Sequence, residues 1–153
     1  MDHDHYPERT IPAGWWFHGQ EEGDILLDFP LFLSSSESEA RGYAGPDGRL
    51  FRIWVPELCV VDTLDVEAVR LLSRGRPIHD PYDDQVYDTA EEFLNACSSD
   101  TWEAMEALGL PSEALVYEGG IQNLYLRNPQ EVLDAARIEL VGAEREETAL
   151  LTP

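Results

Sequence analysis

The sequence predicts a single α+β domain, on the evidence of its length, its composition and the order of its local patterns. The chain has 153 residues, of which 43% are hydrophobic and 10% aromatic, enough for one domain with a sizeable core. Short strand-like runs are mixed with a few helical patterns, and neither a regular βαβ array nor an internal repeat is visible.

The strand-like runs are short and apolar. The clearest is RLFRIWV, where Leu50, Arg52 and Trp54 alternate with apolar residues, as in a strand with one partly exposed face. The apolar piece at 25–29 is of undecided type. Strands are expected at 15–18, 30–34, 49–55, 58–62, 114–117, 123–128 and 136–141.

Capping residues predict the helices. Ser36 followed by Glu39 is a capping box, and similar boxes begin at Thr89 and Asp100. The apolar stripe that contains Trp102 is expected to lie in the core. Helices are expected at 36–44, 65–75, 89–97 and 100–109, with an irregular acidic loop at 76–88.

The two ends of the chain are polar. Residues 1–13 are expected to form a flexible N-terminal arm and 143–153 an acidic C-terminal tail, which leaves 14–142 as the folded domain. The N-terminus lacks the basic and apolar regions of a signal peptide, and no run approaches 18 apolar residues. A cytoplasmic protein without a membrane segment is expected.

The charge limits the class of partner. Ten basic residues, all Arg, stand against 31 acidic ones, for a net charge of −21. Such a chain repels nucleic acid and favours a basic protein partner. The absence of Lys excludes lysine-based catalysis. Cys59 and Cys97 lack metal-ligand spacing, so no metal is expected.

Several chemically useful residues stand where apolar runs end. His18 and Gly19 end the first run, Ser34 to Ser36 end the next, and Tyr43 lies near the end of the helix that follows. A late strand then ends in Asn128-Pro129. In this order the motifs resemble the ADP-ribosyltransferase superfamily, above all its His-Tyr-Glu branch, which includes the poly(ADP-ribose) polymerases and small bacterial and phage-borne toxins.

The resemblance spans roughly residues 15 to 140 and implies a split antiparallel sheet of ADP-ribosyltransferase type, with NAD bound as a substrate in its cleft. On that basis His18 bonds a ribose hydroxyl and the backbone of Gly19 binds the nicotinamide carboxamide. Ser34 and Ser35 support the nicotinamide ribose, and Tyr43 stacks on the nicotinamide ring.

The sequence differs from the family pattern at the position of the catalytic carboxylate. The family carries Glu at the start of the late strand, where this chain has Asn123 or Gln122. An amide can hold a hydroxyl, but it cannot stabilise a cation by charge or accept a proton. Three accounts stay open: Glu118 reaches the site, the protein works with an amide, or catalysis is lost and binding is kept.

The expected function is therefore NAD-dependent transfer of ADP-ribose to a macromolecular acceptor, or hydrolysis of NAD. The alternative is a catalytically inactive acidic binding protein on the same fold, which engages a basic partner or mimics nucleic acid. A related cleft that transfers an RNA 2′-phosphate to NAD is disfavoured by the lack of a basic patch.

Overall fold

The structure is a computed structural model that describes residues 7–141. It is an α+β fold, as predicted. The strands are β1 (Glu8–Ile11), β2 (Gly14–Gln20), β3 (Leu31–Ser34), β4 (Arg49–Val55), β5 (Leu58–Asp62), β6 (Ile78–Asp80), β7 (Gln85–Tyr87), β8 (Ala114–Glu118), β9 (Ile121–Leu126) and β10 (Ile138–Leu140). The helices are α1 (Glu37–Ala44), α2 (Val66–Ser73), α3 (Ala90–Cys97), α4 (Trp102–Leu108), α5 (Pro129–Val132) and a 3₁₀ turn at Ala135–Arg137.

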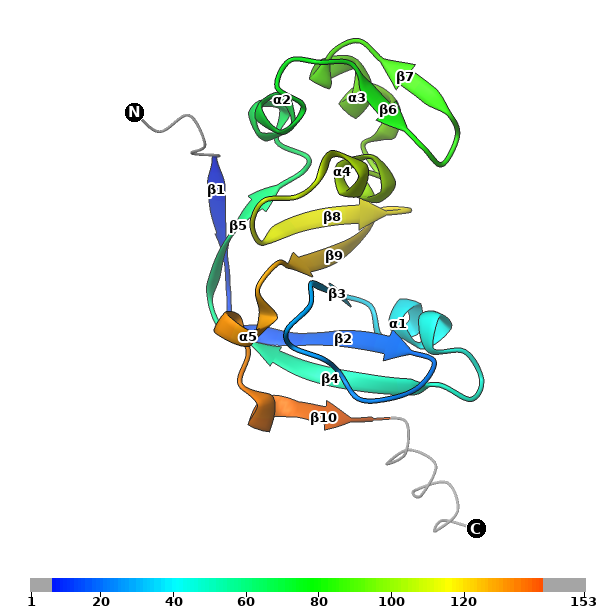
Figure 1. The fold of residues 1–153 in the computed structure, drawn as a ribbon, viewed down its shortest axis with the longest axis vertical. Coiled ribbons are helices and arrows are strands. Elements are labelled where there is room, and N and C mark those ends of the chain that lie inside the picture. The colour runs from blue at the N-terminus through cyan, green and yellow to red at the C-terminus, as the bar shows by residue number, and fades with distance from the viewer. Residues whose placement is uncertain (1–6, 142–153) are drawn as a thin grey trace.

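Within the described residues, one eight-stranded sheet runs in the order β1-β5-β8-β9-β3-β2-β4-β10. It is mixed, so the expectation of a wholly antiparallel sheet is wrong at one place: β5 and β8 are parallel. A parallel pair requires a crossover. Here the crossover is the segment between the two strands, which carries α2, the β6–β7 hairpin, α3 and α4 at one end of the molecule (Figure 1).

The sheet is almost divided between β2 and β3. β2 pairs with β4 along its whole length, from Gly14↔Val55 to Gln20↔Arg49. In the described chain its recorded pairing with β3 is the single pair Phe17↔Ser34. Two half-sheets therefore meet at this point, with β2, β4 and β10 on one side and β3, β9 and β8 on the other (Figure 1).

Two hydrophobic clusters hold the fold. One packs the crossover helices against β8 and β9, with Phe93 and Met105 fully buried at its centre. The other lies on the opposite face and joins both half-sheets through residues such as Ile53 and Leu124. Apolar burial in this second cluster keeps the half-sheets together although few backbone bonds cross between β2 and β3.

Local capping fixes the helices largely as predicted. The side chain of Ser36 accepts from the amide of Glu39, and that of Thr89 from the amide of Glu92. The third predicted cap is wrong: the residue before α4 is Thr101, not Asp100, and its hydroxyl makes no capping bond.

Two other expectations are corrected, and one undecided case is resolved. Part of the supposed flexible arm, Glu8–Ile11, is strand β1 and pairs with β5. The segment 76–88 contains the β6–β7 hairpin. The piece at 25–29 forms neither helix nor strand. The predicted tail at 143–153 lies outside the described residues.

Candidate functional site

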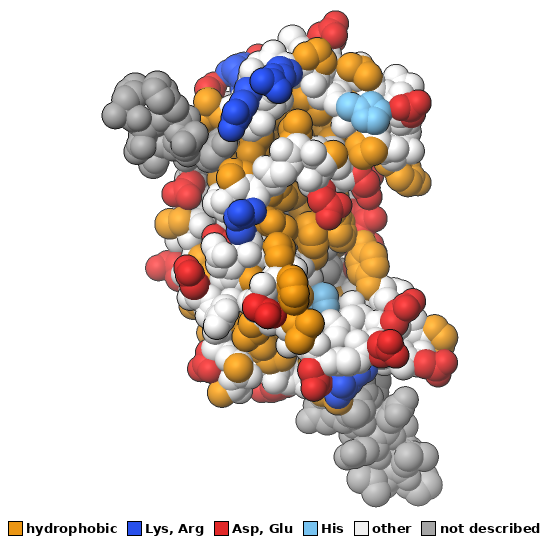
Figure 2. All heavy atoms as spheres, viewed as in Figure 1, with side chains coloured by type: hydrophobic (Ala, Val, Ile, Leu, Met, Phe, Trp, Pro, Cys, Tyr) orange, Lys and Arg blue, Asp and Glu red, His pale blue; other side chains and the backbone are white. Residues whose placement is uncertain are grey.

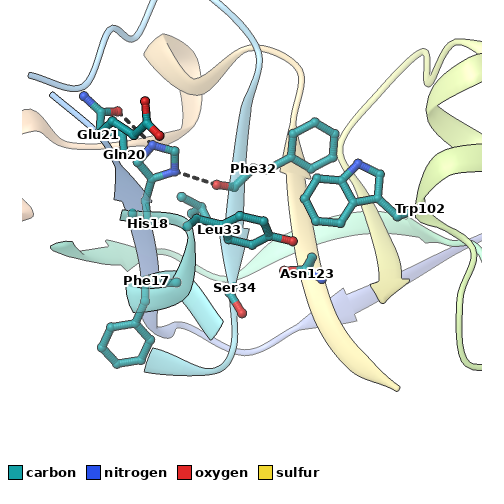
Figure 3. A pocket seen from close by; sticks show the side chains of 12 residues that line it. Phe17, His18, Gln20, Glu21, Phe32, Leu33, Ser34, Trp102 and Asn123 are labelled. Carbon is teal, nitrogen blue, oxygen red and sulfur yellow. Dashed lines mark hydrogen bonds between the residues drawn. The ribbon is translucent and has the colours of Figure 1, made fainter. Parts of the chain in front are cut away.

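A cavity of about 400 Å³ lies where the two half-sheets meet. It draws on β2, β3, α1, α4 and β9, so distant parts of the chain converge on it (Figure 3). Its lining consists of Phe17, His18, Gly19, Gln20, Glu21, Phe32, Leu33, Ser34, Ala40, Tyr43, Trp102 and Asn123. In Figure 2 hydrophobic side chains follow the middle of one face of the molecule, and acidic ones lie around and between them.

His18 is fixed on both sides of its ring. Its Nδ1 donates to the carbonyl of Phe32 at 2.8 Å, which ties β2 to β3 beside the point of division. Its Nε2 lies 2.8 Å from Oε1 of Gln20 (Figure 3). A ligand hydroxyl that approaches Nε2 must therefore displace Gln20, whose amide nitrogen is itself bonded to the carbonyls of Glu22 and Gly23.

Gly19 lies against α1. A Cβ atom added to it would stand 1.8 Å from the carbonyl oxygen of Ala40, much closer than any real contact. Glycine is therefore required here for helix α1 to approach β2. This packing brings the cavity residue Tyr43, on the same helix, over the end of β2.

The three serines separate in space. Ser34 is buried and lines the cavity. Its hydroxyl accepts from the amide of Ser36, which in turn caps α1. Ser35 is exposed, and its amide donates to the carbonyl of Gln122 on β9. Of the serine run, Ser34 is the one whose side chain lies with His18 and Tyr43.

Tyr43 and Glu118 meet although 75 positions separate them. The Tyr43 hydroxyl donates to the carboxylate of Glu118 at the end of β8, so the bond spans from α1 to the β8–β9 hairpin. Burial and the bond and charge of Glu118 raise the pKa of Tyr43 well above its ordinary value. The phenol is therefore held as a neutral donor, and the residue stays 43% exposed at the cavity mouth.

The strand register separates the two candidate amides. Asn123 pairs with Val116, is 1% exposed and lines the cavity. Gln122 pairs with Tyr117 and therefore lies on the opposite face of the sheet. Glu118 is two residues beyond Val116, so it shares the face of Asn123.

Trp102 is a cavity residue that the sequence analysis did not identify. Its ring is stacked on Phe32, with centroids 4.6 Å apart, and meets Tyr43 edge-on at 5.9 Å. The expected core stripe holds for Met105, which is fully buried, but Trp102 stands between that core and the cavity. The one available signal was size, because Trp is seldom buried completely.

Two more carboxyl groups stand near Glu118. Burial raises the pKa of Asp100 and of Glu103, and the negative charge of Glu118 adds to both effects. Glu103 also acts on Tyr43 by charge. Acidic side chains therefore gather behind the α4 side of the cavity, although none of these three lines it.

No family model, curated protein or solved structure matches this chain. Within residues 7–141 no helix has the length and apolar character needed to cross a bilayer. In the same part of the chain, no cluster of three or more His, Cys, Asp or Glu side chains is arranged to hold a metal ion.

Proposed function

We propose that this protein cleaves the bond between nicotinamide and ribose in NAD and transfers the ADP-ribose to a macromolecular acceptor or to water. One observation carries the proposal: His18, Ser34 and Tyr43, from three separate elements, line a single cavity. The near division of the sheet between β2 and β3, which opens this cavity, supports an ADP-ribosyltransferase-type fold.

The cavity suits the nicotinamide end of NAD. It has the size of a small-molecule site, with aromatic walls and a few polar groups. A second hollow of about 880 Å³ shares His18 and Gln20 with it and gives room for the rest of the dinucleotide. In this arrangement His18 bonds a ribose hydroxyl, the backbone of Gly19 meets the carboxamide, and Ser34 supports the ribose.

Glu118 is the carboxylate that we assign to the reaction. When the ribose–nicotinamide bond breaks, its electron pair leaves with neutral nicotinamide, and positive charge develops on the sugar. A carboxylate beside the sugar stabilises that charge and accepts the proton of the incoming acceptor. Glu118 shares a face with Asn123 and is held by Tyr43. Asn123 lies deeper and holds a hydroxyl.

The test is to incubate the whole chain with NAD and to measure the release of nicotinamide by chromatography. Release is expected, together with a rise in Tm when NAD is added, because a ligand that binds the folded state stabilises it. If no nicotinamide is released, the proposal is wrong, whether or not NAD shifts Tm.

Two variants then assign the carboxylate. We expect Glu118→Gln to lower the rate by about a hundredfold or more, which is typical of losing an electrostatic group in a reaction. Asn123→Ala should lower it less, and Glu106→Gln, an exposed acid on α4, is the matched control. Loss of activity in Asn123→Ala alone would show that the amide, not Glu118, serves the reaction.

A catalytically inactive acidic protein that binds a basic partner is the second candidate, supported by the net charge of −21. Its binding should weaken steeply with salt, since exposed charges are screened. Binding that is insensitive to salt in a pull-down would contradict this alternative.

A further inference from the structure

A continuous run of aromatic rings leads from the core to the cavity. Tyr125, which is 8% exposed, contacts Phe32 with centroids 5.0 Å apart, and Phe32 is stacked on Trp102. Trp102 in turn meets Tyr43, the exposed ring at the cavity mouth. The Phe32 and Trp102 rings lie side by side at one end of the cavity (Figure 3). An indole backed in this way is rigid, so a ligand that uses it loses little side-chain entropy.

The backbone at Trp102 is fixed as well. The amide of Thr101, the preceding residue, donates to the carbonyl of Tyr117 at 2.8 Å. The Thr101 hydroxyl accepts from the amide of Tyr117 at 3.1 Å and lies 2.6 Å from the hydroxyl of Thr63. Thr63 and Thr101 are fully buried. The start of α4 is thus bonded to the sheet and presents Trp102 at a set position.

The shape of the two outer rings indicates how a ligand lies. Trp102 and Tyr43 stand at an interplanar angle of 62°, which forms a corner and not a sandwich. A flat ring laid on one of them meets the other with its edge, both favourable aromatic geometries. Among the described residues that line the cavity there is no Arg, and Glu103 and Glu118 act on this corner by charge.

We propose that Trp102 is a ligand-binding residue that, with Tyr43, selects a flat ring carrying a positive charge. The inference deepens the proposed function and rests on it for the identity of the ring: the oxidised nicotinamide of NAD is a pyridinium cation, whereas its reduced form is neutral. An indole face is the strongest aromatic partner for a cation, and the nearby carboxylates add to the attraction.

The test compares two probes of nearly equal shape, neutral nicotinamide and nicotinamide methylated on its ring nitrogen, which is a fixed cation. Affinity is measured by calorimetry and by quenching of tryptophan fluorescence. We expect the cation to bind about tenfold more tightly than the neutral ring, the effect of one desolvated cation–π contact. Equal affinities for the two probes would overturn the charge selection.

Variants test the residue itself. Trp102→Leu should weaken binding of the cation about tenfold. Trp102→Phe should weaken it about threefold, and because this variant keeps a ring against Phe32, it controls for misfolding. Trp54→Phe is the control, because Trp54 packs against Trp15 on β2 and does not line the cavity. The quenching should survive in Trp54→Phe and disappear in both Trp102 variants. Unchanged affinity in Trp102→Leu would overturn the assignment.

Release of nicotinamide from NAD, measured on the same samples, separates this inference from the proposed function. Release by the wild type with no dependence of binding on Trp102 overturns the inference and leaves the function standing. Binding of the cationic probe that depends on Trp102, without release from NAD, supports the role of Trp102 and overturns the proposed function.

Discussion

The two walls of the cavity are built in different ways. The first wall comes from β2, β3 and α1, which follow one another in the chain, and carries His18, Ser34 and Tyr43. The second comes from α4 and β9, and carries Trp102 and Asn123. Glu118, at the end of β8, stands behind this wall and contacts the cavity residue Tyr43. Close backbone packing and a helix cap position the first wall, whereas buried hydroxyl bonds position the second.

Local sequence therefore determines one wall of the site and not the other. The residues of the first wall lie where strands and helices end. Such ends have local sequence patterns, so these residues and their order can be predicted from the sequence. The second wall exists because the crossover returns α4 and β8 beside β9. The hydrogen bond from Tyr43 to Glu118 joins α1, which belongs to the first wall, to the end of β8, which supports the second. The positions of the two walls are therefore linked by this bond.

The largest effect should come from closing the contact that defines the first wall. Gly19→Ala places a Cβ against the Ala40 carbonyl, and we expect a loss of about 3 kcal/mol in the free energy of unfolding, as for severe overpacking. Gly14→Ala, on the same strand with nothing within 4 Å, is the control and should be neutral. Denaturant unfolding of both variants checks this. Equal losses would show that α1 does not approach β2 so closely.

The second wall should be weakened by removing a buried hydroxyl. The Thr63 hydroxyl donates its one hydrogen to the carbonyl of Leu115. In the bond between the two threonines, the Thr101 hydroxyl is therefore the donor, and it also accepts from the amide of Tyr117. Thr101→Val leaves this buried amide short of a partner, and we expect a loss of about 2 kcal/mol. Thr10→Val, at an exposed position of β1, should change stability little.

A double-mutant cycle sharpens this result. If the two hydroxyls act as one unit, the loss in the variant that combines Thr63→Val with Thr101→Val will be smaller than the sum of the single losses. Strict additivity, measured by urea unfolding, would mean that the second wall does not rely on this pair.

Sequence reasoning predicted the first wall well because each of its residues stands in a local pattern. The capping box at Ser36, which begins α1, and the strand predicted at 30–34, which is β3, are confirmed. Sequence reasoning could not predict the second wall. Whether Gln122 or Asn123 faces the cavity depends on the register of β9, because a slip of one residue exchanges the two faces. Trp102 was missed because helical spacing does not distinguish a core stripe from a cavity wall.

A smaller effect should follow from removing the cap of α1. The Ser36 hydroxyl accepts from the amide of Glu39 at 3.2 Å, and Ser36→Ala should cost about 1 kcal/mol, the usual value for an N-cap. Ser38→Ala, at an exposed position of the same helix, is the matched control. Thermal unfolding that shows no difference between the two would mean that the first wall is held by Gly19 packing alone.

The smallest effect concerns the acidity of the second wall. Burial raises the pKa of Glu103 in the folded chain, so the unfolded chain ionises this group first as the pH rises. The stability that the protonated group contributes is complete below its ordinary pKa of about 4.3 and is lost as the pH rises through the raised value.

Glu103→Gln should therefore raise Tm at pH 7 by about 1–2 °C, a small gain because solvent screens a partly exposed group. The gain should vanish near pH 3, where the wild-type carboxyl is neutral as well, and Glu106→Gln should show no such dependence. A gain that is equal at both pH values would come from packing and not from charge. In that case the raised pKa of Glu103 would not limit the stability of the fold at neutral pH.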